Sequence, residues 1–330
     1  MGSLLEIDGL EVTFATESGV VPAVSGVSLA IDRGEMVALV GESGSGKSVT
    51  ALAVLRLLPE PPARVAAGRI LFDGIDLLRL DEEAMRRLRG RRIGMVFQEP
   101  MTSLNPLLSI GRQLTEAMVE HLGLGPGEAA RRAVALLKAV GIPDPKGRLR
   151  QYPHQLSGGM RQRVMIAIAL SCEPDLVIAD EPTTALDVTI QAQILEVMQG
   201  LCARLGVALL LITHNLAIVA RYAHRVNVMY AGRLVESGEA VALYRRPAHP
   251  YTVGLLESVP RLDRPRGAPL EPIPGNPPDP AALPAGCAFR PRCRLARPHC
   301  GERVPGPVEV EPGHRSACFE YRRLLAETPA

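Results

Sequence analysis

The sequence predicts an α/β fold with a mixed-sheet core and a helical subdomain, followed by a small irregular domain rich in cysteine and proline. Two short apolar runs, Met36–Val40 and Leu176–Ala179, have the length and composition of buried parallel strands. Between them, residues from about 100 to 155 carry apolar side chains at helical spacing. After about residue 245 the composition shifts toward proline, and more than half of the 29 prolines follow that point. These observations divide the chain into a core, a helical insertion and a small C-terminal domain.

Residues 1 to about 95 alternate turn signals with β-like runs and contain the first of the two apolar strands. Phe14 lies near the end of an early β-like run and is a candidate for stacking on a nucleotide base. A place in the hydrophobic core is an equally good interpretation of Phe14. The chain has 5 Phe, 6 Tyr and no Trp, so few other side chains could stack on a base.

The segment after the first strand has the composition of a phosphate-binding P-loop. Its residues are Gly41, Glu42, Ser43, Gly44, Ser45, Gly46, Lys47 and Ser48, and Val49 opens a helix-forming run. Glycine lets backbone N–H groups converge on phosphate oxygens. Lys47 would reach the β- and γ-phosphates and neutralise charge during catalysis, and the Ser48 hydroxyl would bind Mg²⁺. The strand before the loop and the helix after it are the context that this motif requires. The sequence therefore predicts binding of a nucleoside triphosphate.

The segment from about residue 100 to 165 is expected to form a helical subdomain. Gln113–Leu122 and Gly127–Val140 show apolar residues three and four positions apart. Turn signals at Gly123–Gly127 and Pro143–Pro145 separate the expected helices.

A second phosphate motif lies within Gln155–Asp187. Its turn consists of Leu156, Ser157, Gly158, Gly159 and Met160, and precedes an apolar helix. Because a helix N-terminus has unsatisfied N–H donors and a partial positive charge, this turn suits an anion. Asp180 and Glu181 follow the second apolar strand, which would deliver both carboxylates to the edge of the sheet. An ordinary polar loop of an α/β domain is the alternative, and the P-loop upstream argues against it.

In their order along the chain these motifs resemble those of ABC-type ATPases, and the resemblance extends from about residue 5 to 325. It implies that Asp180, Ser48 and Gln98 hold Mg²⁺ and its waters. It implies that Glu181 polarises the attacking water as a general base, and that Gln98 senses both the metal and a transmembrane partner. His214 would contact the γ-phosphate. These roles agree with the needs of phosphoryl transfer, which depends on positioning and charge neutralisation.

The resemblance also implies that two ATPase subunits close head to tail around two ATP molecules. The turn at Ser157, Gly158 and Gly159 would then face the P-loop of the partner subunit, and Asp187 would lie at the interface. The resemblance implies a second, different ATPase chain as the partner, and therefore a heterodimer in preference to a homodimer.

Composition and charge limit the other classes of function. The formal net charge is +2, so no general basic field argues for nucleic acid as a partner. No run of 18 apolar residues could span a membrane, and Met1–Glu6 lacks the regions of a signal peptide. The chain is therefore expected at the cytoplasmic face of the cell membrane, held there by its partners.

Four of the six cysteines lie in the C-terminal domain, at Cys287, Cys293, Cys300 and Cys318. Disulfides are not expected in a cytosolic ATPase. Zinc sites usually use more closely spaced cysteine pairs, whereas a cubane iron–sulfur cluster takes four thiolates at wide spacing. The residues alone do not decide between a zinc ion, an iron–sulfur cluster and thiols without metal. Nearby arginines would offset the charge of a thiolate-bound cluster, namely Arg290, Arg292, Arg294 and Arg297. Of the other cysteines, Cys172 and Cys202 are expected in the core.

The C-terminal segment indicates which group of ABC-type ATPases the chain resembles. His249–Thr252, Leu255 and Leu256, the dense prolines of Pro272–Pro284 and the four cysteines resemble the C-terminal extension of oligopeptide, dipeptide and nickel importer ATPases. This implies a nucleotide-binding domain over 1–250, an extension over 251–330 and a 4Fe–4S cluster on the four cysteines, with zinc as the alternative. His299 and His314 are near enough to substitute as ligands, but we expect them in solvent-facing loops.

The same resemblance implies partners and a transported substrate. The partners would be the second ATPase, two integral membrane permease subunits and an extracellular solute-binding protein. Di- or oligopeptides are the expected substrate, with nickel or another small solute as the alternative. Two other functional classes are alternatives: a soluble ABC ATPase acting on DNA or ribosomes, and an iron–sulfur electron-transfer protein with a regulatory nucleotide site. The first lacks tandem domains and basic arms here, and the second does not explain the hydrolytic motifs.

Overall fold

The computed structural model describes residues 2–17, 19–183, 188–258 and 272–327. The chain forms two compact units, each built from segments that are far apart in the sequence. The helical unit comprises residues up to 4, 31–36 and 76–212, and the P-loop unit comprises 5–30, 37–75 and the residues from 213 onward. The C-terminal extension therefore belongs to the same compact unit as the P-loop. The predicted boundary at residue 250 stays a prediction.

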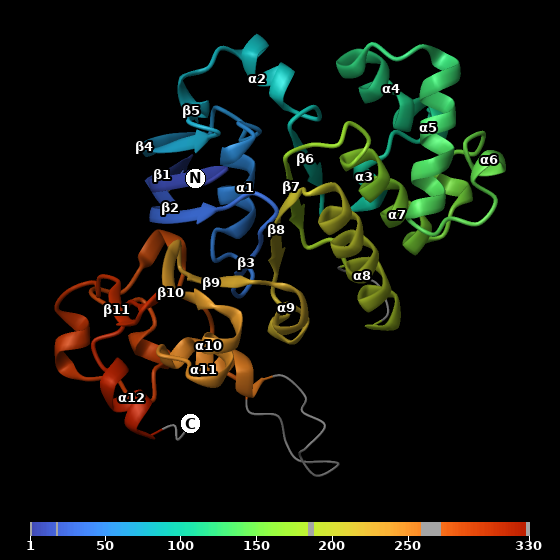
Figure 1. Ribbon diagram of the computed structural model, residues 1–330. Coiled ribbons are helices and arrows are strands. Elements are labelled where there is room, and N and C mark those ends of the chain that lie inside the picture. Colours follow the sequence, from blue (N-terminus) through green and yellow to red (C-terminus); the bar gives the residue numbers. More distant parts are fainter. Residues whose placement is uncertain (1, 18, 184–187, 259–271, 328–330) are drawn as a thin grey trace. The chain divides into compact units, whose positions relative to one another are not determined.

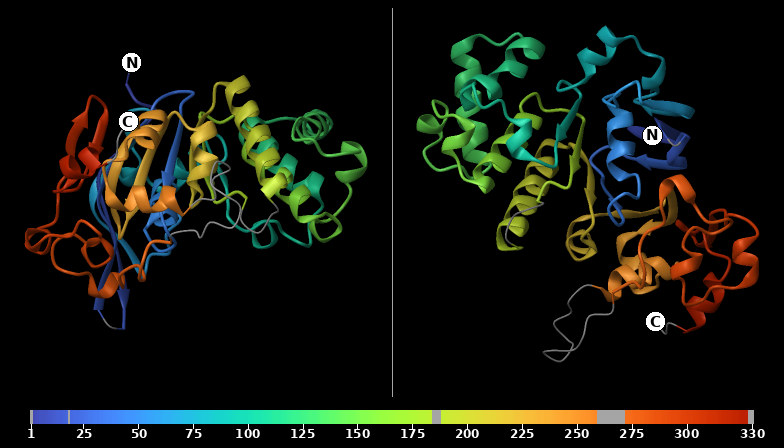
Figure 2. Two further views of the ribbon diagram at one scale, coloured as in Figure 1. Left: turned by 90° about the horizontal axis from the view of Figure 1, so that it is seen from below. Right: turned by 180° about the vertical axis from the view of Figure 1, so that it is seen from behind.

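The P-loop unit contains two sheets. The first has the strand order β2-β1-β4-β5, and β1 runs antiparallel to β4. The second places β11, β12, β10, β9 and β3 side by side; β3 pairs with β9 in parallel, and the other neighbours are antiparallel. The bounds are β1 Leu5–Thr16, β2 Gly19–Ile31, β3 Met36–Val40, β4 Ala63–Phe72, β5 Ile75–Asp76, β9 Arg225–Tyr230, β10 Arg233–Glu239, β11 Val308–Glu311 and β12 His314–Ser316. Figure 2 shows β11 and β12, in red, continuing the sheet beyond the orange β10. This mixed pairing confirms the predicted α/β class with a mixed sheet.

Helices and short turns complete the P-loop unit. They are α1 Lys47–Val54, α9 Leu216–Tyr222, α10 Ala240–Arg245, α11 Pro250–Glu257, α12 Tyr321–Glu327 and the 3₁₀ turns η3 Pro280–Ala282, η4 Arg290–Arg292 and η5 Pro298–Gly301. The described part of the proline-rich run forms only η3 and irregular chain, as predicted, because proline supplies no N–H to helix or strand.

The helical unit carries the parallel strands β6 Ile93–Val96, β7 Leu176–Asp180 and β8 Ala208–Thr213, with β7 in the middle. The predicted strand at Leu176–Ala179 is thus confirmed. Its helical elements are η1 Leu77–Arg79, α2 Glu82–Leu88, α3 Pro100–Ser103, α4 Ile110–Leu122, α5 Pro126–Ala139, α6 Pro145–Arg148, η2 Pro153–Gln155, α7 Gly158–Ala169 and α8 Val188–Leu205. The helices α4, α5 and α7 pack against one another in the green part of Figure 1.

Local sequence explains why α4 has these limits. The Ser109 hydroxyl accepts a hydrogen bond from the N–H of Arg112 and caps the helix N-terminus. Gly123 ends the helix in the left-handed region, at φ 64°. The buried face of α4 is Ile110, Leu114 and Met118, one residue per turn, so the amphipathic spacing seen in the sequence is the packing face.

Aromatic side chains pack the extension onto the sheet of the P-loop unit. The rings of Tyr230 on β9, Tyr251 on α11 and Phe289 before η4 have centroids 4.6 to 5.4 Å apart, and all three residues are buried. Tilted and edge-on contacts of this kind stabilise beyond the apolar area that they bury.

A buried carboxylate on β10 also holds the extension to the sheet. Glu236 of β10 accepts hydrogen bonds from the N–H groups of Ala248 and His249, at 2.6 and 3.0 Å, and lies 2.8 Å from Nε2 of His314 on β12. The side chains of Glu236 and His314 are 0% and 2% exposed. The expectation that His314 is solvent-facing is therefore wrong, because β12 joins the sheet beside β10. His299 is half exposed and pairs with Glu320.

The buried imidazole of His249 predicts an acid-sensitive fold. Its Nδ1 accepts a hydrogen bond from the Tyr251 N–H, and burial lowers the pKa of His249 from 6.5 to about 3. The unfolded chain gains a proton below about pH 6.5 that the folded chain excludes, so this group's stability contribution is lost as pH falls from about 6.5 toward 3. We expect the free energy of unfolding to fall by up to about 1.4 kcal/mol per pH unit more steeply in the native chain than in His249→Asn.

Urea unfolding at several pH values between 7 and 5 measures these slopes. Asparagine keeps an oxygen acceptor for the helix N-terminus but does not titrate in this range. Equal slopes for the two chains would mean that His249 does not carry the acid sensitivity.

Candidate functional site

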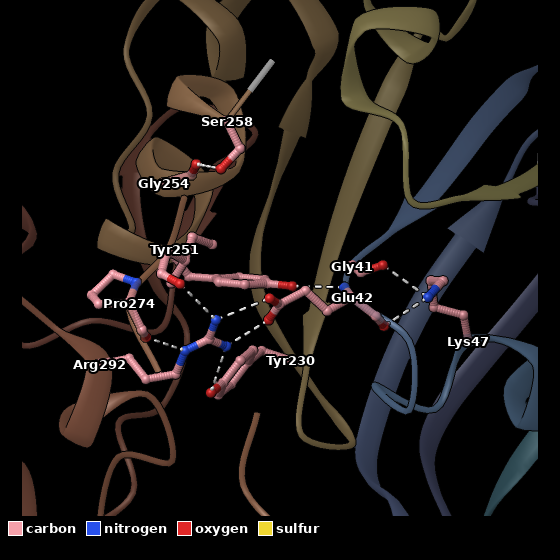
Figure 3. Close-up of polar contacts among 10 residues, drawn as sticks. Gly41, Glu42, Lys47, Tyr230, Tyr251, Gly254, Ser258, Pro274 and Arg292 are labelled. Carbon is pink, nitrogen blue, oxygen red and sulfur yellow. Dashed lines mark hydrogen bonds and ion pairs between the residues drawn. The ribbon is translucent and has the colours of Figure 1, made fainter. Parts of the chain in front are cut away.

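In the P-loop unit, residues 41–46 connect β3 to α1, as predicted, and Lys47 and Ser48 of the motif are the first two residues of the helix. The side chain of Lys47 folds back over the loop. Its Nζ donates hydrogen bonds to the carbonyl oxygens of Gly41 and Glu42, both at 2.9 Å (Figure 3). The same nitrogen lies 3.4 Å from Oγ of Ser45. Lys47 is 4% exposed. The loop therefore holds its one ammonium group at its own centre, where a phosphate oxygen can be bound by exchange of a carbonyl partner.

Close packing explains why two glycines of the loop are needed. A Cβ added to Gly41 would lie 2.1 Å from the carbonyl oxygen of Met229 on β9. A Cβ added to Gly46, whose φ is +101°, would lie 2.5 Å from the Ala23 carbonyl oxygen on β2 and 2.7 Å from Cε of Met229. No heavy atom comes within 4 Å of a Cβ at Gly44. One side of the loop is thus pressed against β2 and β9.

In the helical unit, the carboxylates lie at the end of β7. Asp180 is the last residue of the strand and is 6% exposed. Glu181 has a φ of +44°, which is rare for a residue with a side chain and costs on the order of 1 kcal/mol. Its N–H donates to the Ile212 carbonyl at 2.9 Å, and its Oε2 accepts a hydrogen bond from Nε2 of Gln98 at 3.1 Å. The structure thus brings Gln98 into contact with Glu181, directly after Asp180.

The glycine turn also forms in the helical unit. Ser157 caps α7, and its hydroxyl accepts a hydrogen bond from the Met160 N–H at 3.4 Å. Ser157 and Gly158 are exposed, and a Cβ on Gly159 would lie 3.3 Å from Cγ2 of Ile190. The first turn of α7 therefore presents N–H donors to an anion at the surface of this unit.

Three other predicted site residues have differing outcomes. Phe14 is half-buried near the end of β1, opposite Ala63 on β4, so it is not a fully enclosed core residue. His214 is exposed directly after β8. Asp187 lies outside the described residues. The assigned roles of all these residues stay predictions.

The four C-terminal cysteines converge. Cys287, Cys293, Cys300 and Cys318 line one small cavity of about 20 Å³, together with apolar side chains such as Phe289 and Leu295. Burial raises the pKa of Cys287 and Cys293, and raises the pKa of Cys318 to about 12. Hydrogen bonds from backbone N–H groups act against this at each of the three thiols, from Phe289 and Arg290 at Cys287, from Leu295 at Cys293 and from Glu320 at Cys318.

Within the described ranges, no group of three or more His, Cys, Asp or Glu side chains is placed so that it could hold a metal ion. The expected cluster therefore has no support from a formed ligand set. The other cysteines, Cys172 and Cys202, are 1% and 4% exposed, as expected of core residues. Among the helices in the described part of the chain, none is both long and apolar enough to cross a membrane.

One contact of the P-loop was missed by sequence reasoning. The carboxylate of Glu42 is paired with Arg292 of the extension, 250 residues away. The interpretation that Arg292 offsets charge at the cysteines is therefore wrong, because its guanidinium is paired with Glu42. No local pattern could have signalled the pair, since an Arg next to a Cys has many possible partners.

Two family models match the chain. The model of the ABC transporter family matches residues 24–184, and that of the oligopeptide/dipeptide transporter C-terminal region matches residues 235–300. A putative peptide import ATP-binding protein of Brucella melitensis is 53% identical over 98% of both chains. The dipeptide transport ATP-binding protein DppD of Bacillus subtilis is 51% identical, over 97% of this chain and 95% of that protein.

Solved structures of ATP-binding cassettes are also similar to this chain. A dimeric post-hydrolysis state of the ATP-binding cassette MJ0796, bound to ADP and Pi, has a TM-score of 0.65 and 27% identity and covers 72% of this chain. CbiO1 from Clostridium perfringens, part of an ABC transporter complex, has a TM-score of 0.62 and 29% identity and covers 74% of this chain. These matched chains are covered to 98% and 91% of their own lengths.

The glycine geometry of the loop predicts different costs for two alanine substitutions. Gly44→Ala adds a Cβ in open space and pays only for a left-handed backbone, about 1–2 kcal/mol. Gly46→Ala places alanine at φ +101°, further from the left-handed minimum, and also forces its Cβ onto the Ala23 carbonyl, so we expect it to lower the free energy of unfolding by at least about 2 kcal/mol more. Urea unfolding of both variants without nucleotide measures the difference. Equal costs would show that the loop is not pressed against β2.

Proposed function

Because this chain belongs to the ABC transporter family of ATP-binding subunits, we propose that it hydrolyses ATP to drive the import of di- or oligopeptides across the cytoplasmic membrane. One observation carries the choice of substrate: the cassette motifs are followed by a C-terminal region of the oligopeptide/dipeptide transporter type. Relatives that match nearly the whole chain are named for peptide or dipeptide transport.

Reconstitution tests this function. The chain is purified with the two permeases, the partner ATPase and the solute-binding protein that we propose as its partners, and placed in proteoliposomes. We expect ATP-dependent uptake of a labelled dipeptide or short oligopeptide. Uptake of Ni²⁺ without peptide uptake would overturn the substrate class, and ATP hydrolysis unaffected by any of these partners would overturn the transport role.

The chemistry assigned to the site follows from charge and position. Mg²⁺ bound by Ser48, Asp180 and Gln98 would neutralise the negative charge of the transferring phosphoryl group. Glu181 accepts a proton from the attacking water, and the hydrogen bond from Gln98 supports its orientation. Lys47 holds the β- and γ-phosphates, and His214 contacts the γ-phosphate. Adenine stacking on Phe14 completes nucleotide binding.

The general-base role predicts the effect of Glu181→Gln. Glutamine keeps the size and one hydrogen-bond partner of the side chain but cannot take a proton, so kcat for ATP should fall at least 100-fold while ATP binding is retained. Single-turnover hydrolysis by the assembled importer, together with an ATP titration, measures both. Glu99→Gln, on an exposed residue next to Gln98, serves as the control. Undiminished hydrolysis at this subunit's site would refute the role of Glu181.

A head-to-tail pair of ATPase subunits is the proposed assembly. The exposed turn of Ser157 and Gly158 supports it, since that anion-binding helix end has no phosphate of its own chain assigned to it. The matched cassette MJ0796 is described as dimeric. In the heterodimer that we propose, the turn serves the ATP on the partner's P-loop, and Asp187 lies at the interface.

An exposed apolar patch supports docking to a permease at the membrane's cytoplasmic face. Phe97, Met101 and Leu107 are 39%, 63% and 83% exposed; Met101 lies in α3, and the other two lie close to this helix along the chain. Large exposed apolar side chains that lie close together along the chain are candidates for an interaction surface. Phe97 directly precedes Gln98, whose side chain donates a hydrogen bond to Glu181. A permease segment bound at Phe97 would therefore lie next to a residue that contacts the proposed general base.

For the extension, we propose that the four thiols of the cysteine cavity bind a 4Fe–4S cluster. The shared cavity supports the proposal, because it gathers four thiols among apolar side chains, and backbone hydrogen bonds lower the pKa of three of them. Binding a cluster would require these thiols to close into a ligand set, which they do not form in the described part of the chain. Hydrogen bonds to sulfur and burial are the features by which a protein holds and tunes such clusters. The cluster would stabilise an irregular segment that has only a small core of its own, formed by Val253, Leu295 and Leu324.

Anaerobic purification tests the cluster. We expect iron and acid-labile sulfide in equal amounts and a broad visible absorbance band, and we expect Cys318→Ser to lose both. Cys202→Ser, at a buried cysteine elsewhere in the chain, is the matched control and should keep both. Zinc in place of iron, or metal-free protein with an unchanged melting temperature, would contradict the proposal.

A further inference from the structure

The second residue of the P-loop is an acid held by a buried arginine. Nη1 of Arg292 donates to Oε2 of Glu42 at 2.6 Å, and Nη2 donates to Oε1 at 3.0 Å (Figure 3). The side chain of Arg292 is 4% exposed and that of Glu42 is 27% exposed. Two parallel hydrogen bonds of this kind fix both the distance and the plane of the carboxylate.

The rest of the guanidinium is also held in place. Nε donates to the carbonyl of Pro274 at 2.9 Å, and Nη1 lies 3.4 Å from the hydroxyl of Tyr230. The cation lies 5.9 Å from the ring centroids of both Tyr230 and Phe289. Although burial by itself would lower the pKa of Arg292, the hydrogen bonds with Glu42 and Tyr230 raise it. Arg292 is therefore a permanently charged group with a fixed position.

The backbone of Glu42 joins this contact to the catalytic lysine. The Glu42 N–H donates to the hydroxyl of Tyr251 at 2.8 Å, and the Glu42 carbonyl accepts from Nζ of Lys47 at 2.9 Å. Glu42 thus has its carboxylate and its N–H bound by residues from beyond position 250, while its carbonyl helps to place Lys47. All of these residues lie in the P-loop unit.

A carboxylate in a phosphate-binding loop is an electrostatic problem. ATP is a polyanion, and a second negative charge a few ångströms away would weaken its binding unless an opposite charge cancelled it. Arg292 supplies that charge from the side of Glu42 on which the extension packs.

We propose that Arg292 is a positioning residue for ATP binding, which acts through Glu42 by cancelling its charge and fixing the start of the P-loop. The inference rests on ATP binding by this loop, which is part of the proposed function. It assigns to the extension a role in the nucleotide site of its own chain, separate from any metal that the cysteines bind.

A double-mutant cycle on the full chain tests the proposal, with MgATP titrated by calorimetry. Arg292→Met removes the charge and leaves the Glu42 carboxylate unpaired, so we expect the Kd for ATP to rise on the order of tenfold. In the Glu42→Gln background the same Arg292→Met change should alter the Kd less than twofold, because no charge is left to cancel. In steady-state assays on the importer, KM for ATP should rise more than kcat falls.

Two further variants separate positioning from general stability. Arg246→Met breaks another Arg–Glu pair that joins the extension to the cassette, with Glu311, far along the chain from the loop. We expect it to leave the Kd for ATP unchanged. Arg292→Lys keeps the charge and loses the two-pronged geometry, so its Kd should fall between those of the native chain and Arg292→Met. If Arg292→Met does not fold, the Kd of Arg292→Lys for ATP tests the proposal in its place.

The outcomes are distinguishable. A native chain that fails to bind ATP would overturn the proposed function itself. A native chain that binds ATP, with Arg292→Met equally harmful in both backgrounds or harmless in both, would overturn the role of Arg292 alone.

Discussion

The fixed path of the chain through Gly41–Ser48 is the constraint on which the rest of the structure depends. Phosphate is bound by backbone N–H groups, which cannot be adjusted by a side-chain rotamer, so the backbone has to be held in advance. On one side, β2 and β9 leave no room for a Cβ at Gly46. On the other, Arg292 and Tyr251 hold Glu42. The extension thus completes the support of the loop that the sheet begins.

Much of this architecture could be predicted from the sequence, because its signals are local. The apolar runs at Met36–Val40 and Leu176–Ala179 are strands in the structure, and the amphipathic spacing around Gln113–Leu122 is the buried face of α4. Asp180 and Glu181 lie at the end of β7, as the apolar run before them predicts, whereas the hydrogen bond from Gln98 to Glu181 depends on the pairing of β6 with β7, which the order of motifs does not fix. Such patterns reflect the period of one element and need no knowledge of its neighbours.

What the sequence could not show are the contacts between distant segments. The pairing of Arg292 with Glu42 joins residues 250 positions apart, and no spacing rule links them. The burial of His314 has the same origin, since a three-residue strand gains its place only by pairing with β10. The aromatic packing of Tyr230, Tyr251 and Phe289 brings two parts of the extension onto β9. These contacts make the extension part of the P-loop unit, which its irregular, proline-rich composition does not suggest.

The most direct test of this account is hydrogen–deuterium exchange over residues 41–48 in the full chain without nucleotide. The N–H of Glu42 is bound to Tyr251, so this segment should exchange slowly in the native protein and markedly faster in Arg292→Met, while β9 exchanges at the same rate in both. Equal exchange of residues 41–48 in the two proteins would show that the extension does not hold the loop, and would contradict the central claim.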